Sequence, residues 1–236
     1  MEICVDSLES ARNAIEGGAK RLEVCSALSE GGLTPSPGLI KKINSFSPVP
    51  IFAMLRLRPG NFVYTQEDMD VMLNDLEILK DHGAQGFVFG ALTATDEIDV
   101  PFCKEVLRRA NPLPVTFHRA FDEVADPLSS LETLIELGFR IVLTSGQQDT
   151  AEEGLSLIEC LVRQARDRII IMPGSGITKK NILKIKMETG ATEFHASAKK
   201  RVVSRGNRVQ IGADKKSFVS VTDRDLVREM VKIITN

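Results

Sequence analysis

The chain has 236 residues, and its formal charge is −2 because 30 Lys and Arg face 32 Asp and Glu. Apolar residues make up 43% and charged residues 26%, as in an average soluble globular protein. This balance lacks the basic excess of proteins that bind nucleic acid or anionic membranes, so we expect neither partner. The sequence also lacks a membrane-spanning apolar run and a signal peptide, which favours a soluble, cytosolic protein.

Short apolar runs alternate with amphipathic stretches along the whole chain. The spacing of Met69, Met72, Leu73 and Leu76, for example, predicts a helix over 66–82. The predicted strands cover 2–5, 21–25, 51–57, 86–92, 114–118, 140–144, 169–172 and 192–195. The predicted helices end at 17–18, begin near 36–37, cover 66–82, begin at 101, and then cover 127–138, 151–166, 179–190 and 221–234.

Eight strand–helix units of this kind predict a parallel sheet with helices outside it. Their number and the length of the chain fit a TIM-like (β/α)₈ barrel, which typically has about 250 residues. A doubly wound open sheet is the alternative, but residues 4–7, at the end of the first strand and just after it, contain no glycine for its usual fingerprint. We therefore predict one TIM-like barrel domain over 1–236, with a long insertion at 199–216 after the eighth strand.

The carboxyl ends of barrel strands form the functional face of such a fold, and ionisable side chains occur there in this sequence. One interpretation is a structural lattice of Glu–Arg pairs that plugs the barrel. The other is an active site, in which His118 and Asp122 could form an acid–base pair. The candidate catalytic residues are Glu2, Glu23, His118, Asp122 and His195.

Many barrels hold a phosphate on the loops after strands seven and eight. The glycine-rich segment 174–176 could form such a cradle, although glycine-rich turns also simply connect a strand to a helix. Two arginines after the third strand add bidentate donors for an anionic ligand. The candidate anion-binding residues are Arg56, Arg58, Ser145, Gly146, Gly174, Ser175 and Gly176.

Four cysteines without a secretory signal do not indicate a disulfide framework. Cys4 and Cys25 lie near the carboxyl ends of the first two strands, and adjacent parallel strands lie ~4.8 Å apart, so their sulfurs could come within reach of each other. Two thiolates suit Cu(I) and suit Mg²⁺ or Ca²⁺ poorly. Ordinary buried cysteines are the alternative interpretation.

Five strings of the sequence resemble the CutC family of copper homeostasis proteins. They are EICVDS at 2–7, RLEVC at 21–25, EGGLTPS at 30–36, PVTFHRAFD at 114–122 and LTSG at 143–146. The resemblance implies a TIM-type barrel that is cytoplasmic, and in animals also nuclear, and that forms homodimers or homotetramers. It also implies copper as the bound metal, with Cu(I) ligated by Cys4 and Cys25.

The sequence departs from the family pattern after the third strand, where RLRPGNF at 56–62 replaces the usual RPRGGDF. Pro59 removes an N–H group and the freedom to take positive φ, and Asn61 removes an acid. Ser175 stands where the family often has a third glycine. Two functions stay open: a Cu(I)-binding protein, and an enzyme acting on a small anionic or phosphorylated substrate. A non-catalytic scaffold is a third alternative.

Overall fold

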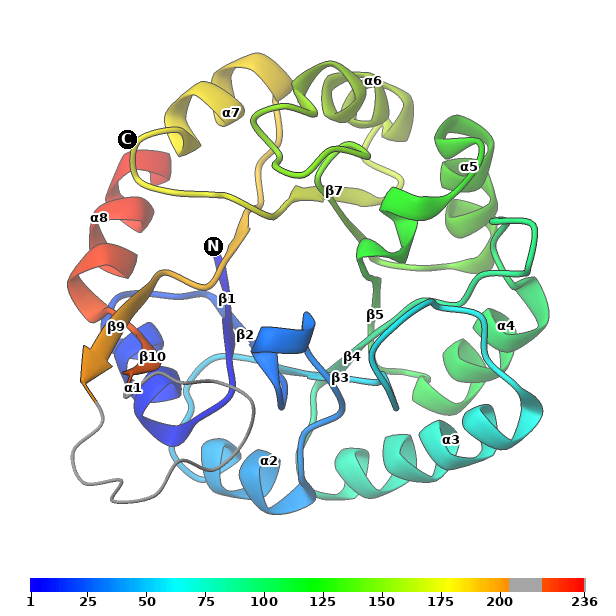
Figure 1. The fold of residues 1–236 in the computed structure, drawn as a ribbon, viewed down its shortest axis with the longest axis horizontal. Coiled ribbons are helices and arrows are strands. Elements are labelled where there is room, and N and C mark those ends of the chain that lie inside the picture. The colour runs from blue at the N-terminus through cyan, green and yellow to red at the C-terminus, as the bar shows by residue number, and fades with distance from the viewer. Residues whose placement is uncertain (204–217, 236) are drawn as a thin grey trace.

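The computed structural model describes residues 1–203 and 218–235, and it has strands inside and helices outside (Figure 1). The barrel strands are β1 (Glu2–Val5), β2 (Arg21–Val24), β3 (Ile51–Met54), β4 (Gly86–Phe89), β5 (Val115–Phe117), β6 (Ile141–Thr144), β7 (Ile170–Pro173) and β8 (His195–Ala196). The α-helices are α1 (Leu8–Glu16), α2 (Pro37–Asn44), α3 (Gln66–Asp81), α4 (Val100–Ala110), α5 (Pro127–Leu137), α6 (Leu155–Ala165), α7 (Ile182–Thr189) and α8 (Arg224–Thr235). Two short 3₁₀ helices, η1 (Leu28–Glu30) and η2 (Arg119–Glu123), follow β2 and β5. Within the described residues, no helix is both long and apolar enough to cross a bilayer.

The eight strands form one parallel sheet in the order β7-β6-β5-β4-β3-β2-β1-β8. β7 and β8 are its two edges, so the barrel is nearly closed, and the predicted TIM-like fold is confirmed. In the ladders of β1, Cys4 lies opposite Glu23 of β2, and Glu2 lies opposite both Arg21 of β2 and His195 of β8. The first barrel strand, β1, therefore pairs both with β2 and with the last barrel strand, β8.

Local sequence signals explain the helix ends. Thr65 and Asp68 form a capping box at the start of α3, and Asp126 caps α5, whose first residue is Pro127. Alternation along the strands then separates two apolar layers. One side of the sheet packs against the helices, and the other fills the barrel with side chains such as Phe52, Met54 and Leu143.

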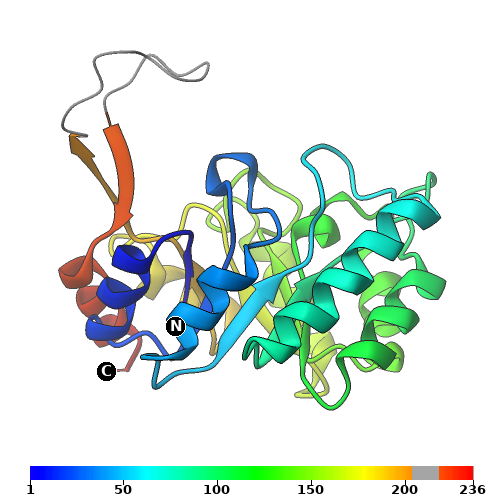
Figure 2. The ribbon, with the colours of Figure 1, turned by 90° about the horizontal axis from the view of Figure 1, so that it is seen from below.

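The structure corrects several predicted boundaries. β3 and β4 end at Met54 and Phe89, three residues before the ends predicted for them, because the chain turns into loops at the barrel mouth. The predicted insertion begins with β9 (Lys199–Val203), which pairs antiparallel with β10 (Phe218–Thr222) beyond it, and residues 204–216 of the insertion lie outside the described residues. Figure 2 shows this pair rising from the mouth side of the barrel. The last helix consequently begins at Arg224 rather than at 221.

Candidate functional site

Three side chains on β1, β2 and the start of β8 bring possible metal ligands together inside the barrel. One donor atom each from Cys4, Glu23 and His195 lies within 4.8 Å of the other two. The strand register explains the cluster, because Cys4 faces Glu23 across the β1–β2 ladder and β8 pairs directly with β1. All three residues are buried. Thiolate, carboxylate and imidazole together are a donor set for a transition metal. We call these three residues the Cys4 cluster.

The side chain of Glu2 orients the imidazole of the Cys4 cluster. His195 Nδ1 lies 2.7 Å from Glu2 Oε1, which leaves Nε2 on the side of Glu23 Oε2, 3.7 Å away. Arg21 donates from Nε to Glu2, and its Nη2 lies 2.7 Å from Glu193 Oε2. A carboxylate behind a histidine is the usual arrangement that fixes a metal-binding imidazole. Glu2 is therefore a positioning residue for His195.

The crowded charges of this region shift three pKa values. Burial by itself would raise the pKa of Glu2, but His195 and Arg21 outweigh burial and lower this pKa to about 2. Burial raises the pKa of Glu23. Burial opposes protonation of His195, but Glu23, Cys4 and Glu2 together raise its pKa well above the usual value. Without a metal, the acidic groups around His195 therefore stabilise the protonated form of its imidazole.

Cys25 lies just beyond the end of β2, where its side chain contacts Glu23. The partner of Cys4 in the ladder is Glu23, and Cys25 follows two residues later, just beyond the end of β2. Its Sγ lies 3.5 Å from Glu23 Oε2, and its side chain is fully buried beside Met54. Burial, Glu23 and Cys4 raise the pKa of the Cys25 thiol. Cys25 therefore contacts the Cys4 cluster through Glu23.

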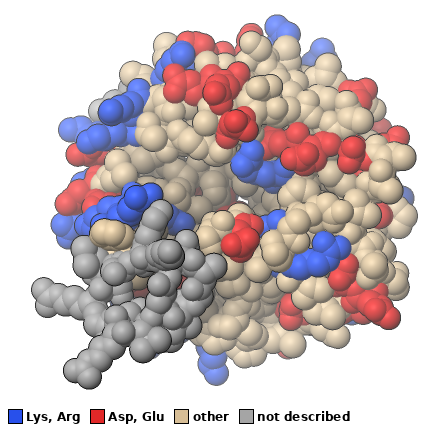
Figure 3. All heavy atoms as spheres, in the orientation of Figure 1, with Lys and Arg blue, Asp and Glu red and all other residues tan. Residues whose placement is uncertain are grey.

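A cavity of about 620 Å³ extends from the Cys4 cluster toward the loops at the barrel mouth. Figure 3 shows the face of Figure 1 hollowed near its centre, with both basic and acidic side chains bordering the hollow. Arg56, His118 and Arg119 line the cavity together with the Cys4 cluster. Its volume is in the range of small-molecule sites.

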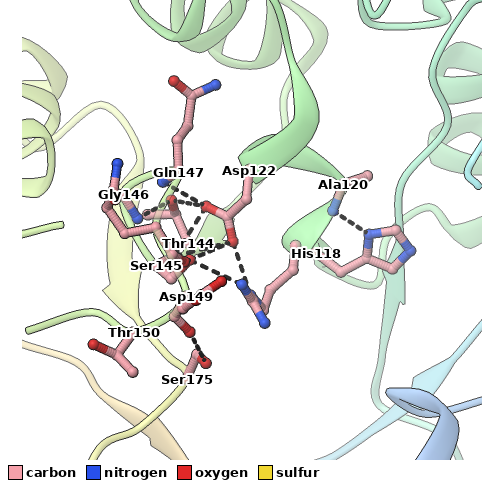
Figure 4. Close-up of polar contacts among 12 residues, drawn as sticks. His118, Ala120, Asp122, Thr144, Ser145, Gly146, Gln147, Asp149, Thr150 and Ser175 are labelled. Atoms are coloured by element: carbon pink, nitrogen blue, oxygen red, sulfur yellow. Dashed lines mark hydrogen bonds and ion pairs between the residues drawn. The ribbon is translucent and has the colours of Figure 1, made fainter. Parts of the chain in front are cut away.

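The structure does not bring His118 and Asp122 together as the expected acid–base pair. His118 Nδ1 accepts a hydrogen bond from the Ala120 N–H at 3.1 Å, and the imidazole packs against Phe62 with ring centroids 4.9 Å apart. Figure 4 shows that His118 and Asp122 extend in different directions from η2. The short 3₁₀ turn between them separates their side chains. Burial and the nearby Arg56 lower the pKa of His118 to about 3, so it is neutral.

Asp122 instead holds the loop that follows β6 (Figure 4). Its Oδ1 accepts hydrogen bonds from Thr144 Oγ1 at 2.5 Å and from the Gln147 N–H at 3.3 Å. Its Oδ2 accepts from Ser145 Oγ at 3.0 Å and from Arg119 Nε at 2.8 Å, and the Ser145 N–H adds a further bond. We call these five residues the Asp122 cluster. Its carboxylate is saturated with donors, so Asp122 is a positioning residue.

Three of the seven predicted anion-binding residues line the cavity, and the other four do not. Arg56, Ser175 and Gly176 line the cavity. Arg58 instead forms an ion pair with Asp68 at 3.1 Å. The other three support the loops: Ser145 and Gly146 belong to the loop bound by Asp122, and Gly174 packs between Leu143 and His195.

The loop with the sequence departures supports Arg56. Arg56 Nη2 donates to the Gly60 carbonyl at 3.1 Å, and Nη1 donates to the Glu30 carbonyl at 2.6 Å. Asn61 Oδ1 accepts from Arg58 Nη1 at 3.3 Å. The loop with Pro59 and Asn61 thus still holds the Arg56 guanidinium at the cavity.

Sequence reasoning missed two arginines. Arg21 lies in the second predicted strand with no local signal of a role, and only the register shows that it faces Glu2. Arg119 precedes Asp122 by three residues, a spacing that permits an ion pair within one helical turn and is the only local signal for it.

Comparison with known proteins gives consistent matches along the chain. The model of the CutC family matches residues 1–200. The human copper homeostasis protein cutC homolog is 48% identical over 243 residues, which cover 100% of this chain and 89% of the relative. A CutC family protein of Parabacteroides distasonis is 45% identical over 239 residues, with 98% of each chain covered. A crystal structure from Streptococcus agalactiae that carries the name CutC matches with a TM-score of 0.79 at 32% identity, covering 83% of this chain and 97% of that one.

Proposed function

Because the chain belongs to the CutC family, we propose that it is a cytoplasmic copper homeostasis protein that binds Cu(I) as its cargo. The observation that carries this proposal is the convergence of Cys4, Glu23 and His195 within 4.8 Å. A thiolate and an imidazole are ligands that Cu(I) accepts readily. The resemblance of the sequence to the family supports self-association into homodimers or homotetramers as part of this proposal.

Cys4 supplies the principal sulfur ligand, because its side chain both belongs to the cluster and reaches the cavity wall. His195 presents Nε2 while Glu2 holds Nδ1. Cys25 supplies the second thiol, next to Glu23. A buried site with two thiols and an imidazole would favour a soft monovalent ion over Mg²⁺ or Ca²⁺.

An anaerobic Cu(I) titration in competition with a chromophoric chelator tests this proposal. We expect one ion to bind per chain, and we expect Cys4→Ser to lower the affinity at least ~100-fold because a first ligand is lost. Cys25→Ser should weaken binding less. Cys103→Ser is the matched control, since Cys103 is a buried cysteine in α4. Equal affinity in Cys4→Ser and Cys103→Ser would rule out the proposed site.

A second candidate function is an enzyme that acts on a small anionic or phosphorylated substrate in the same cavity. One specific observation favours it: within the described residues, Glu23 Oε1, Arg56 Nε and His118 Nε2 are buried polar atoms without hydrogen-bond partners. A buried polar atom without a hydrogen-bond partner lowers the stability of the fold, so its presence is typical of a catalytic or ligand-binding site. In this function Glu23, His118 and His195 would transfer protons, Glu2 would position His195, and Asp122 would hold the loop after β6.

Turnover of small anionic compounds tests the second candidate. The metal-free and Cu(I)-loaded proteins are incubated with a mixture of carboxylates and phosphate esters, and losses are followed by mass spectrometry. We expect a loss that Glu23→Gln abolishes. If no compound disappears faster with the unchanged protein than with Glu23→Gln, the enzyme proposal fails and the copper proposal is unaffected.

A further inference from the structure

Arg119 presents a guanidinium that other side chains already hold in place. Its Nε donates to Asp122 Oδ2 at 2.8 Å, and its Nη2 donates to Ser145 Oγ at 2.9 Å. Nη1 has no hydrogen-bond partner within residues 1–203 and 218–235. The side chain is 44% exposed and lines the cavity. A guanidinium fixed along one edge and free at Nη1 is ready to bind an oxyanion without losing much side-chain entropy.

The loop after β7 offers backbone donors at the same cavity. Ser175 and Gly176 both have positive φ, +72° and +67°, so the chain makes a left-handed turn there. In the described part of the chain, the N–H groups of Ser175, Gly176 and Ile177 donate to no acceptor. The carbonyls of Ser175 and Gly176 are occupied by Ala151 N and Asn181 Nδ2. Successive free N–H groups in such a turn form a concave anion-binding site.

The N–H groups on either side of this loop are occupied, which isolates the free donors. The Gly174 N–H donates to the Thr144 carbonyl at 2.9 Å, and the Thr178 N–H donates to Asn181 Oδ1 at 2.8 Å. Between them lie the three residues without an acceptor, all of which line the cavity with Arg119. The two sets of donors are also linked, since Ser145, which binds Arg119, belongs to the loop that leads to Ala151, and Ala151 binds the Ser175 carbonyl.

The electrostatics of the adjoining wall favour an anion. Arg56 is buried, and its guanidinium is bound by the carbonyls of Glu30, Gly32 and Gly60 rather than by a carboxylate. Its charge therefore stays available to a ligand. Of the acidic residues that line the described part of the cavity, Glu23 lies with Cys4 and His195, and Glu30 binds the Arg56 guanidinium through its carbonyl. An asymmetric ligand would thus place its anionic group by the arginines.

We propose that Arg119 and the N–H groups of Ser175, Gly176 and Ile177 bind the phosphate group of a small phosphate monoester. The remainder of this ligand extends toward the Cys4 cluster. Three terminal oxygens with several lone pairs match four separate donors, whereas a carboxylate has only two oxygens. This inference rests on the second candidate function and specifies its substrate class; it does not depend on copper.

A ³¹P NMR titration of the full-length, metal-free protein in phosphate-free buffer tests the inference. The probes are glycerol 2-phosphate and inorganic phosphate, and malonate is the carboxylate competitor. We expect saturable binding of glycerol 2-phosphate. Arg119→Gln should lower the affinity at least tenfold, because a charge-assisted hydrogen bond is lost. Arg119→Lys should recover part of the affinity. Arg168→Gln is the matched control, since Arg168 is 43% exposed and pairs with Glu132.

Three outcomes would overturn the inference. Equal affinity in Arg119→Gln and Arg168→Gln would place the phosphate elsewhere. Malonate binding as tight as glycerol 2-phosphate binding, with the same dependence on Arg119, would show a carboxylate site. If neither phosphate probe binds, the substrate class is wrong, and the turnover experiment separately decides whether the protein is an enzyme. Near-ultraviolet circular dichroism of Arg119→Gln establishes that any loss occurs in a folded protein.

Discussion

The Asp122 cluster and the Cys4 cluster both contain a buried carboxylate, but their polar atoms are satisfied to very different degrees. Asp122 accepts hydrogen bonds from two hydroxyls, two backbone N–H groups and Arg119. Glu23 Oε1 has no partner in the described residues, and its neighbours include Glu2 and two thiols. The difference separates roles: a saturated carboxylate holds loops in place, and an incompletely bonded one remains available to a ligand.

The largest expected effect comes from replacing each carboxylate by its amide. Asp122→Asn should lower the free energy of unfolding by about 4 kcal/mol, because an NH₂ group would then face donors that were satisfied. Glu23→Gln should change it by less than about 1 kcal/mol, because the charge that it removes is buried and only partly bonded. Urea unfolding of the metal-free proteins measures both values.

Equal destabilisation by Asp122→Asn and Glu23→Gln would contradict the proposed difference between the two clusters. That result would mean that Glu23 is as strongly bound in the fold as Asp122. A stabilising effect of Glu23→Gln would support the difference between the two clusters, because it would show that the protein retains Glu23 at a cost in stability.

The sequence was sufficient to predict the fold and most members of the site. Alternating strands and helices gave the barrel, and ionisable groups at strand ends identified Cys4, Glu23 and His195. Their grouping could not be predicted, because it depends on the register between β1 and β2 and on the pairing of the first strand with the last. A strand period of two specifies which side a residue faces, but not which residue lies opposite it.

The Asp122 cluster was harder to predict for a different reason. Thr144, Ser145 and Gln147 follow Asp122 by 22 to 25 residues, and they reach it only because β5 and β6 are neighbours. From sequence, an acid four residues after a histidine suggests a catalytic pair. In the structure, the 3₁₀ turn η2 directs the two side chains apart. Local spacing was therefore misleading where tertiary hydrogen bonds decided the geometry.

The next effect in size tests how tightly the Asp122 cluster is packed. Gly146 has φ +71°, and a Cβ atom there would lie 2.4 Å from the Gly154 carbonyl oxygen. Gly146→Ala should lower the free energy of unfolding by about 3 kcal/mol, from backbone strain together with this overlap. Gly138 has φ +91° with open space around it, so Gly138→Ala isolates the strain at about 1 kcal/mol. Equal losses in the two variants, measured by urea unfolding, would show that the loop after β6 can move to accommodate a side chain.

The smallest expected effect concerns His118, which lies on the cavity wall and, like Glu23, has a buried atom without a partner, Nε2. Burial and Arg56 lower its pKa to about 3, whereas the unfolded chain has a pKa of about 6.5. The unfolded state therefore binds more protons between these two values, so the stability contributed by neutral His118 is complete above pH 6.5 and declines as the pH falls. Between pH 7 and pH 5 this decline amounts to about 2 kcal/mol.

Replacing His118 by Asn removes the titrating group. Between pH 7 and pH 5, the free energy of unfolding of this variant should therefore fall by about 2 kcal/mol less than that of the unchanged protein. The comparison must use the difference between the two proteins, because His195 acts in the opposite sense: its raised pKa stabilises the fold at low pH and loses that effect as the pH rises. Identical pH profiles would mean that His118 becomes protonated in the folded state and finds a partner for its charge. In that case the cavity wall could adjust to an added charge, and His118 would belong with the saturated groups of the Asp122 cluster.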